Sequence, residues 1–188
     1  MTRIVMCAAI LGLLSMNPGR DSQQQAKDQE DIARADRAGF ALIGISVRTN
    51  NAKEATPDGV IPGQWQKLFG EGLLGKIPNQ TESVLYAVYT DYAGDHTGDY
   101  TYIIGLPVRE GTPPPEGMVA THVLAGQYAK FTTAQGPFAK IIPAAWQHIF
   151  SLEEQGKLKR VYQTDFEVYD QRSQDPENAQ LDIYVGVK

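Results

Sequence analysis

The sequence is poor in the residues that build metal sites, disulfides and nucleic-acid surfaces. It has one cysteine, Cys7, which excludes an intramolecular disulfide and any metal site made of several cysteines. Its three histidines, His96, His122 and His148, lie far apart along the chain, so we expect no metal ion. The formal net charge is −5 and no stretch concentrates lysine and arginine, so we expect no nucleic-acid partner.

Cofactor motifs are also missing. The glycines of Gly70-Glu71-Gly72 and of residues 94–98 lack the P-loop lysine and the strand–glycine–helix order of a dinucleotide site. The serines lie in no nucleophile elbow. We therefore expect a protein without a cofactor.

Long hydrophobic runs are absent apart from one near the start of the chain. Residues Ile4 to Leu14 form an apolar run that is too short to span a membrane but has the length of a signal-peptide core. No small-residue cleavage site follows it. The sequence favours a cytoplasmic protein and leaves two alternatives open: export through a signal peptide at residues 1–16, or a start of translation after the run.

Residues 20–38 are almost wholly polar and charged, and such a segment buries too little apolar surface to order itself. We therefore expect an apolar run and polar tether at residues 1–38, followed by one folded domain at residues 39–188. The only proline run, at residues 113–115, is too short to separate two domains. It is expected to connect two halves of one domain.

One ten-residue stretch occurs twice. Ile61 to Gly70 returns as Ile142 to Ser151, an offset of 142 − 61 = 81 residues, with five of ten positions identical. In both copies the apolar residues recur at the spacing of one helix face, and a proline occupies the second position, where an expected first turn needs no N–H. Each copy therefore predicts an amphipathic helix. The tryptophan of each copy, Trp65 or Trp146, is explained by core packing unless other residues give it a further role.

The segments around each helix repeat as well. They are rich in β-branched and aromatic residues and end in polar turn formers, which indicates strands. The expected strands are Phe40 to Arg48, Val84 to Asp91 and Tyr100 to Leu106 in the first half, and Met118 to Phe131 (bent near Gly126), Thr164 to Asp170 and Leu181 to Val187 in the second. The predicted fold is α+β: two strand–helix–strand–strand repeats, at about residues 39–108 and 117–188, with pseudo-two-fold symmetry and two main helices on an antiparallel sheet.

Glu167 departs from the repeat. It lies in the middle of a predicted strand, where the first half has Ala87. A carboxylate at such a position either faces solvent or lies in a buried site with a partner. The nine tyrosines lie mostly on the predicted strands, and most are explained by packing. If some converge on one concavity with the tryptophans, they would form a wall suited to flat, cationic or amphipathic ligands.

Several motifs, taken together and in order, resemble the GyrI-like effector-binding family, in particular its stand-alone, integron-associated branch. They are Gly44 to Asn51, Ile61-Pro62 with Trp65, Tyr86 to Tyr89, Gly126 to Phe131, Trp146, Asp165 to Tyr169, and Asp182 to Tyr184. The resemblance runs from about Phe40 to Lys188 and implies the two-repeat fold derived above. Relatives in this family bind lipophilic cations in a central aromatic cleft with a buried glutamate. The resemblance assigns that glutamate to Glu167 and the aromatic neighbours to Trp65, Tyr86, Tyr128, Trp146 and Tyr184.

The resemblance favours a stand-alone sensor or sequestering protein that binds small cationic or amphipathic organic molecules. Residues 1–38 are too short and too polar for the DNA-binding domain of the family's regulators. An alternative is a hydrolase that opens strained electrophilic rings, with Glu167 as general base. A protein inhibitor of DNA gyrase ranks last, because no dense acidic stripe mimics DNA. The oligomeric state is left open.

Overall fold

The computed structural model describes residues 32–188, which cluster into one compact unit. The apolar run expected at residues 1–16 lies outside the described residues. Within residues 32–188, none of the helices combines the length and the apolarity that a membrane span requires.

The described chain has two strand–helix–strand–strand repeats, as the sequence predicts. The first contains β2 (Phe40–Thr49), α3 (Ile61–Gly70), β3 (Leu85–Thr90) and β4 (Tyr100–Val108). The second contains β6 (Gly126–Thr132), α4 (Phe138–Glu154), β7 (Arg160–Tyr169) and β8 (Asp182–Val187). A short strand precedes each repeat, and short helical turns fill three connections: β1 (Ala33–Arg37), β5 (Val119–Val123), α2 (Asn51–Glu54), η1 (Leu73–Lys76) and η2 (Gln171–Ser173).

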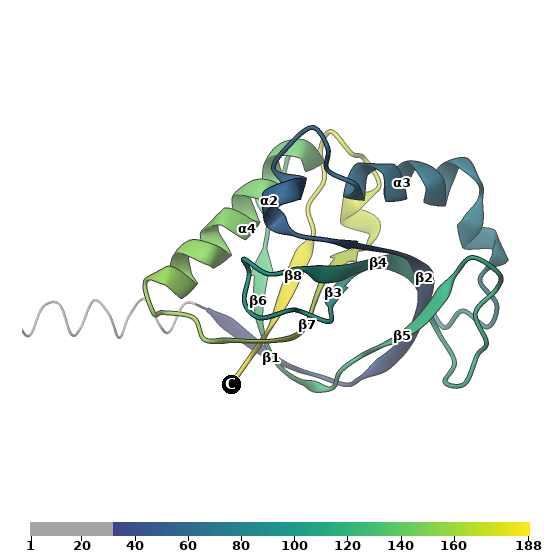
Figure 1. Cartoon of the computed structure of the whole chain (residues 1–188), viewed down its shortest axis with the longest axis horizontal. Coiled ribbons are helices and arrows are strands. Elements are labelled where there is room, and N and C mark those ends of the chain that lie inside the picture. Colours follow the sequence, from purple (N-terminus) through teal and green to yellow (C-terminus); the bar gives the residue numbers. More distant parts are fainter. Residues whose placement is uncertain (1–31) are drawn as a thin grey trace, which may run out of the picture. The chain divides into compact units, whose positions relative to one another are not determined.

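All eight strands form one antiparallel sheet in the order β1-β6-β8-β7-β3-β4-β2-β5. The order is symmetric about its centre, where β3 of the first repeat pairs with β7 of the second. Figure 1 shows α3 and α4 above one face of this sheet, with β1 and β5 at its two curled edges. The α+β fold with a pseudo-two-fold arrangement is therefore confirmed.

The folded unit begins earlier than the sequence predicts. We expected it to start at Gly39, after a polar tether, but it starts at Ile32, and β1 pairs along its length with β6. The segment is polar because it is an edge strand: its backbone makes the contacts, and charged side chains such as Arg34 and Asp36 can remain at the surface. An apolar pattern was therefore not needed to order it.

The two long helices differ in where their prolines fall. In α3, Pro62 lies in the first turn as predicted, and the carboxylate of Glu54 accepts hydrogen bonds from the N–H groups of Val60 and Ile61 at its start. α4 starts one turn earlier than its repeat partner, at Phe138, so Pro143 is inside the helix. The extra turn extends α4 along the sheet beyond the length that the repeat predicts.

The sheet has an apolar layer on each face. The larger layer, between the helices and the sheet, includes Ile43, Ile104 and Ile183. The smaller layer, on the opposite face, includes Leu42, Val88 and Phe166. Because successive side chains of a strand point to opposite faces, neighbours such as Phe166 and Glu167 belong to different layers. This alternation decides which residues reach the helices.

Candidate functional site

Glu167 lies at the centre of the sheet, under the two helices. It is on β7, opposite Ala87 of β3 and Ile183 of β8, and is 1% exposed. Three side chains donate hydrogen bonds to it. Its Oε1 accepts from Trp146 Nε1 at 2.7 Å and from the Tyr89 hydroxyl at 2.9 Å, and its Oε2 accepts from the Tyr169 hydroxyl at 2.6 Å. Of the two environments that the sequence left open for this carboxylate, the structure has the buried one, with partners.

Two opposing effects act on the charge of Glu167. Burial raises its pKa, because the ionised form loses contact with water, whereas the hydrogen bonds from Tyr169, Trp146 and Tyr89 act to lower it. Burial prevails, so the pKa lies above its ordinary value. The indole of Trp146 can only donate, so Oε1 remains an acceptor, and a proton would reside on Oε2 beside Tyr169. The carboxylate is thus costly to ionise until a positive charge approaches.

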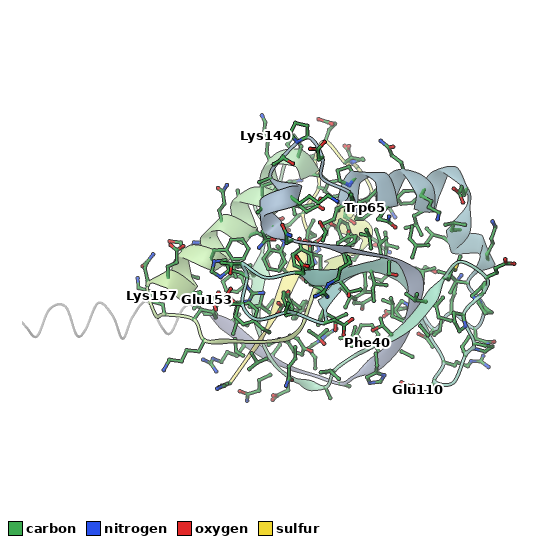
Figure 2. All side chains as sticks on the ribbon, in the orientation of Figure 1. Phe40, Trp65, Glu110, Lys140, Glu153 and Lys157 are labelled. Carbon is green, nitrogen blue, oxygen red and sulfur yellow. The ribbon has the colours of Figure 1, made fainter. Side chains whose placement is uncertain are left out.

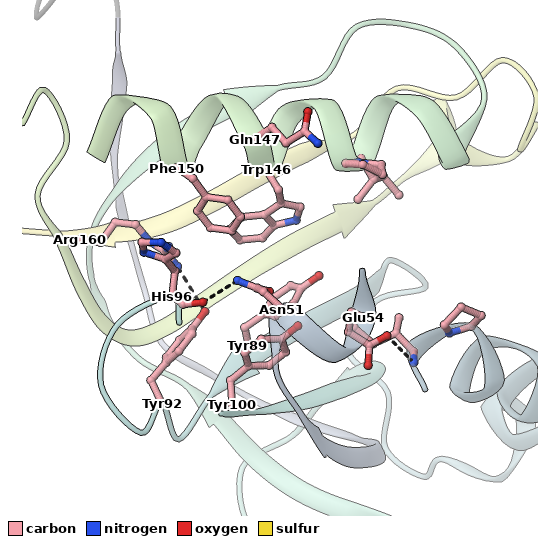
Figure 3. A pocket seen from close by; sticks show the side chains of 14 residues that line it. Asn51, Glu54, Tyr89, Tyr92, His96, Tyr100, Trp146, Gln147, Phe150 and Arg160 are labelled. Atoms are coloured by element: carbon pink, nitrogen blue, oxygen red, sulfur yellow. Dashed lines mark hydrogen bonds between the residues drawn. The ribbon is translucent and has the colours of Figure 1, made fainter. Parts of the chain in front are cut away.

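A cleft of about 350 Å³ lies between α4, the start of α3 and the β3–β4 loop; we call it the first cleft. Tyr89 and Trp146, the two donors to Oε1 of Glu167, both line it. Figure 3 shows Trp146 and Phe150 extending from α4 toward Tyr89, Tyr92 and Tyr100 on the facing side. The first cleft is lined by Asn51, Glu54, Ile61, Pro62, Tyr89, Tyr92, His96, Tyr100, Ile142, Pro143, Trp146, Gln147, Phe150 and Arg160.

The β3–β4 loop closes one end of the first cleft. The His96 ring stacks on Phe150 with centroids 5.1 Å apart, and its backbone carbonyl accepts a hydrogen bond from the Asn51 side chain at 2.8 Å (Figure 3). Arg48 donates to the carbonyls of Asp91 and Asp99 on either side of the loop. These contacts fix the loop against α2 and α4. The His96 side chain is therefore held in place where it closes the end of the cleft.

A buried ion pair lies at the same end of the cleft. Arg160 contacts Asp165, whose carboxylate also accepts from the Tyr92 hydroxyl at 2.6 Å and from Gly186 N at 2.8 Å. Burial acts to lower the pKa of Arg160, but the charge of Asp165 outweighs it, and the pKa lies above its usual range. The guanidinium also lies 4.3 to 5.9 Å from four ring centroids, those of Tyr92, Trp146, Phe150 and Tyr162. The protein's own cation therefore occupies the aromatic box at this end.

The structure brings together three of the six residues that the sequence assigned to the site. Glu167 and Trp146 are in direct contact, and Trp65 makes an edge-to-face contact with Tyr169, the third donor to Glu167, with centroids 4.8 Å apart. Tyr86, Tyr128 and Tyr184 lie on the other face of the sheet, around Phe166. The hydroxyl of Tyr86 donates to Glu82 and that of Tyr128 donates to the carbonyl of Leu124.

Strand parity separates these two groups of residues. Tyr86 pairs with Val168 and Tyr184 with Phe166, the immediate neighbours of Glu167, and neighbours face opposite ways. The same rule identifies the tyrosines that were not assigned. Tyr89 is two residues from Ala87, and Tyr169 is two residues from Glu167, so both share the face of the carboxylate. The family resemblance selected aromatic residues on both faces of the sheet, whereas the period of the strand distinguishes those that share the face of Glu167.

Within residues 32–188, no group of three or more histidine, cysteine, aspartate or glutamate side chains is arranged to hold a metal ion. The three histidines are well separated in the fold: His96 stacks on Phe150, His122 contacts Glu110, and His148 contacts Phe131.

Comparison with known proteins gives a consistent result. Residues 36–187 match the profile of a family described as integron-associated effector binding protein. The chain is 30% identical over 158 residues to the YobU protein of Bacillus subtilis, covering 84% of this chain and 96% of YobU. It is 42% identical over 180 residues to the transcriptional regulator BrlR of Pseudomonas aeruginosa, covering 85% of this chain but only 63% of BrlR.

Solved structures with a similar fold include two small proteins. The integron cassette protein VCH_CASS2 from the mobile metagenome of Vibrio cholerae has a TM-score of 0.67 and 28% identity, covering 84% of this chain and 95% of that one. The protein SAV2435, solved bound to tetraphenylphosphonium, has a TM-score of 0.66 and 16% identity, covering 84% of this chain and 94% of that one. At this lower identity the likeness of SAV2435 concerns the fold alone.

Proposed function

Because the chain belongs to the family of integron-associated effector binding proteins, we propose that it binds a small, flat organic cation in the first cleft, as a sensor or sequestering protein. The observation that carries the proposal is the position of Glu167: a buried carboxylate lies directly behind two of the aromatic side chains that line the cleft. The tetraphenylphosphonium bound to SAV2435, a tetrahedral organic cation on the same fold, supports an organic cation as the ligand, while the flat shape is inferred from the facing aromatic walls of the cleft.

The geometry accounts for selectivity toward cations. A flat ligand against Tyr89 and Trp146 places its positive charge on ring faces that attract cations, with the carboxylate of Glu167 behind them. Glu167 itself is 1% exposed, so water screens its attraction for the cation less than it would at an exposed site. The arrival of a cation also favours the ionised form of Glu167, which burial otherwise disfavours.

Arg160 sets the orientation of the ligand within the cleft. Its guanidinium already occupies the rings at the His96 end, next to Asp165. Because these ring faces are already taken by the guanidinium, the cationic part of the ligand is expected toward Glu167 and the apolar part toward Phe150. A cleft of about 350 Å³ is at the small end of the range for organic ligands, and suits a molecule of two or three fused rings.

Calorimetric titration with N-methylacridinium, a flat cation of this size, tests the proposal. Glu167→Gln retains the shape of the side chain and removes its charge, so affinity is expected to fall about tenfold or more, equivalent to about 1–3 kcal/mol. The matched control is Glu82→Gln, which removes an exposed carboxylate that also accepts a tyrosine hydrogen bond, on the opposite face of the sheet. Unchanged affinity in Glu167→Gln, or equal losses in both variants, would contradict the proposal.

A further inference from the structure

A second and larger cavity lies on the other side of Glu167. Its volume is about 970 Å³, and it lies between α3, the start of α4 and the ends of β3, β4 and β7. We call it the second cavity. It is lined by Trp65, Gln66, Phe69, Leu74, Gln80, Ser83, Val84, Leu85, Leu106, Phe138, Tyr169, Asp170, Gln171, Ser173, Gln174 and Pro176. No residue of this set lines the first cleft.

The wall of the second cavity repeats the wall of the first cleft. Trp65, Gln66 and Phe69 of α3 line the second cavity, and the identical residues 81 positions later, Trp146, Gln147 and Phe150 of α4, line the first cleft. Tyrosine completes both walls, as Tyr169 in the second cavity and Tyr89 in the first cleft. The four side-chain types therefore occur in both sites, one set on each half of the molecule.

The ring geometry is also repeated. Trp65 meets Tyr169 at 4.8 Å and 62°, and Trp146 meets Tyr89 at 5.0 Å and 65°. Trp65 and Phe69 lie 6.0 Å apart at 25°, and Trp146 and Phe150 lie 5.8 Å apart at 31°. Figure 2 shows Trp65 beneath α3, on the side of the helix that faces the sheet. The repeat thus gives the two walls the same arrangement of rings.

Glu167 connects the two sites. Its Oε1 accepts hydrogen bonds from residues of the first cleft, and its Oε2 accepts one from Tyr169 of the second cavity. Because Ala87 takes the equivalent position in the first repeat, one carboxylate serves both walls. In the second cavity it is screened behind a tyrosine that is 8% exposed.

The two sites differ in charge. The first cleft is lined by Glu54 and Arg160, whereas the only charged residue that lines the second cavity is Asp170. Arg172 donates to both oxygens of Asp170 and neutralises it. The remaining polar lining is uncharged: four glutamines and two serines. In addition Phe69 is 58% exposed at the wall, which leaves an aromatic ring open to a ligand.

We infer that the second cavity is a second ligand site, built by the repeat, for an uncharged aromatic molecule that carries a hydrogen-bond acceptor. Its aromatic wall stacks on the ring, and an amide or hydroxyl of the lining donates a hydrogen bond to the acceptor. The inference does not depend on cation binding in the first cleft, because no lining residue is shared.

Acridine and N-methylacridinium, which share a shape but differ in charge at mildly alkaline pH, test the inference. Gln66 and Gln147 are exposed on equivalent helix turns and line the two sites, so Gln66→Trp narrows the second cavity and Gln147→Trp narrows the first cleft with little effect on folding. Calorimetry is expected to show acridine binding weakened about tenfold or more by Gln66→Trp and unchanged by Gln147→Trp. N-methylacridinium is expected to show the opposite pattern. The acridine result tests the second cavity, and the N-methylacridinium result tests the proposed function of the first cleft separately.

A second pair of variants tests the wall itself. Phe69→Ala removes an exposed ring of the second cavity and Phe150→Ala removes its counterpart in the first cleft. Acridine is expected to lose several-fold in affinity with the first variant only. The inference is overturned if wild-type protein does not bind acridine, if acridine tolerates both Gln66→Trp and Phe69→Ala, or if the first-cleft variants weaken acridine equally. Circular dichroism melting of each variant confirms that the measured losses concern folded protein.

Discussion

Ala87 and Glu167 face each other across the central pair of strands, β3 and β7. They are equivalent positions of the two repeats. A residue at this position lies close to the pseudo-two-fold axis, so a single carboxylate there contacts Trp146 of α4 directly and is linked to Trp65 of α3 through Tyr169. Two carboxylates at these positions would be buried next to each other and would repel. Both repeats therefore have the same packing, but only the second has a carboxylate at this position.

The first prediction concerns the pH dependence of stability. Because burial raises the pKa of Glu167 above the ordinary value of 4.5, the native state retains this proton over a pH range in which the unfolded chain has lost it. Stability must then fall as pH rises through that range, whereas a glutamine has no such dependence. We expect the unfolding free energy of wild-type protein, relative to Glu167→Gln, to decrease from about pH 4 upward and then level off. Urea denaturation across the range measures it, and a difference that rises with pH would contradict the burial argument.

The second prediction concerns the ion pair of Arg160 and Asp165. Asp165→Asn removes the closer of the two carboxylates beside the buried guanidinium and leaves only Glu153 at 3.7 Å, so we expect a loss of about 3 kcal/mol in unfolding free energy. Asp170→Asn is the control, because it removes the partner of Arg172 in a pair that is about one-third exposed, and about 1 kcal/mol or less is expected. Urea denaturation measures both. Similar losses would mean that burial of the Arg160 pair contributes little.

The third prediction concerns β1. A chain that starts at Gly39 lacks the strand that covers β6, as well as the contact of Arg37 over the Tyr184 ring at 4.9 Å. We expect its thermal midpoint to lie about 4 °C or more below that of a chain that starts at Ile32. Scanning calorimetry of the two proteins decides the question. Equal midpoints would restore the boundary that the sequence predicts.

The fourth prediction concerns two glycines at equivalent positions of the repeat. A Cβ on Gly105 would lie 2.0 Å from the Ile43 carbonyl oxygen, in the backbone of the neighbouring strand. At Gly186 the nearest atom would be a Val161 methyl at 2.9 Å, in a side chain that can move, with the next atom at 3.2 Å. Gly105→Ala is therefore expected to cost about 3 kcal/mol or more, and Gly186→Ala clearly less. The same cost in chemical denaturation for both would show that β2 and β4 separate easily.

The repeat made most of the fold predictable. Periodicity of 3.6 in the helices and runs of β-branched and aromatic residues in the strands are local signals, and the second copy confirmed the interpretation of the first. β1 was missed because an edge strand is held by its backbone, and the sequence Ala33 to Arg37 carries no pattern that reports its partner β6. The early start of α4 was missed because the proline at position 143 suggested a helix start.

The site was predicted less completely than the fold. The repeat singled out Glu167 but left its burial open, and only the family resemblance implied a buried glutamate. Its partners depend on which face of the sheet each tyrosine occupies, and the resemblance did not take that into account. Neither the repeat nor the alternation of side chains along a strand predicts the ion pair of Arg160 and Asp165. Both residues are on β7, but the strand shifts register between them relative to β8, and this irregularity lets the two side chains meet. Such a shift has no counterpart in the first repeat and could not be inferred from it.

The exchange of outer strands has a consequence for the separated halves. β1 precedes the first repeat but pairs with β6 of the second, and β5 precedes the second repeat but pairs with β2 of the first. Neither repeat therefore covers its own outermost strand, and cleavage at the proline connector would leave β2 or β6 with an open row of backbone donors and acceptors. An open edge of this kind acts as a template for other chains. Each isolated half is thus expected to aggregate, and the two fragments mixed together are expected to stay in solution.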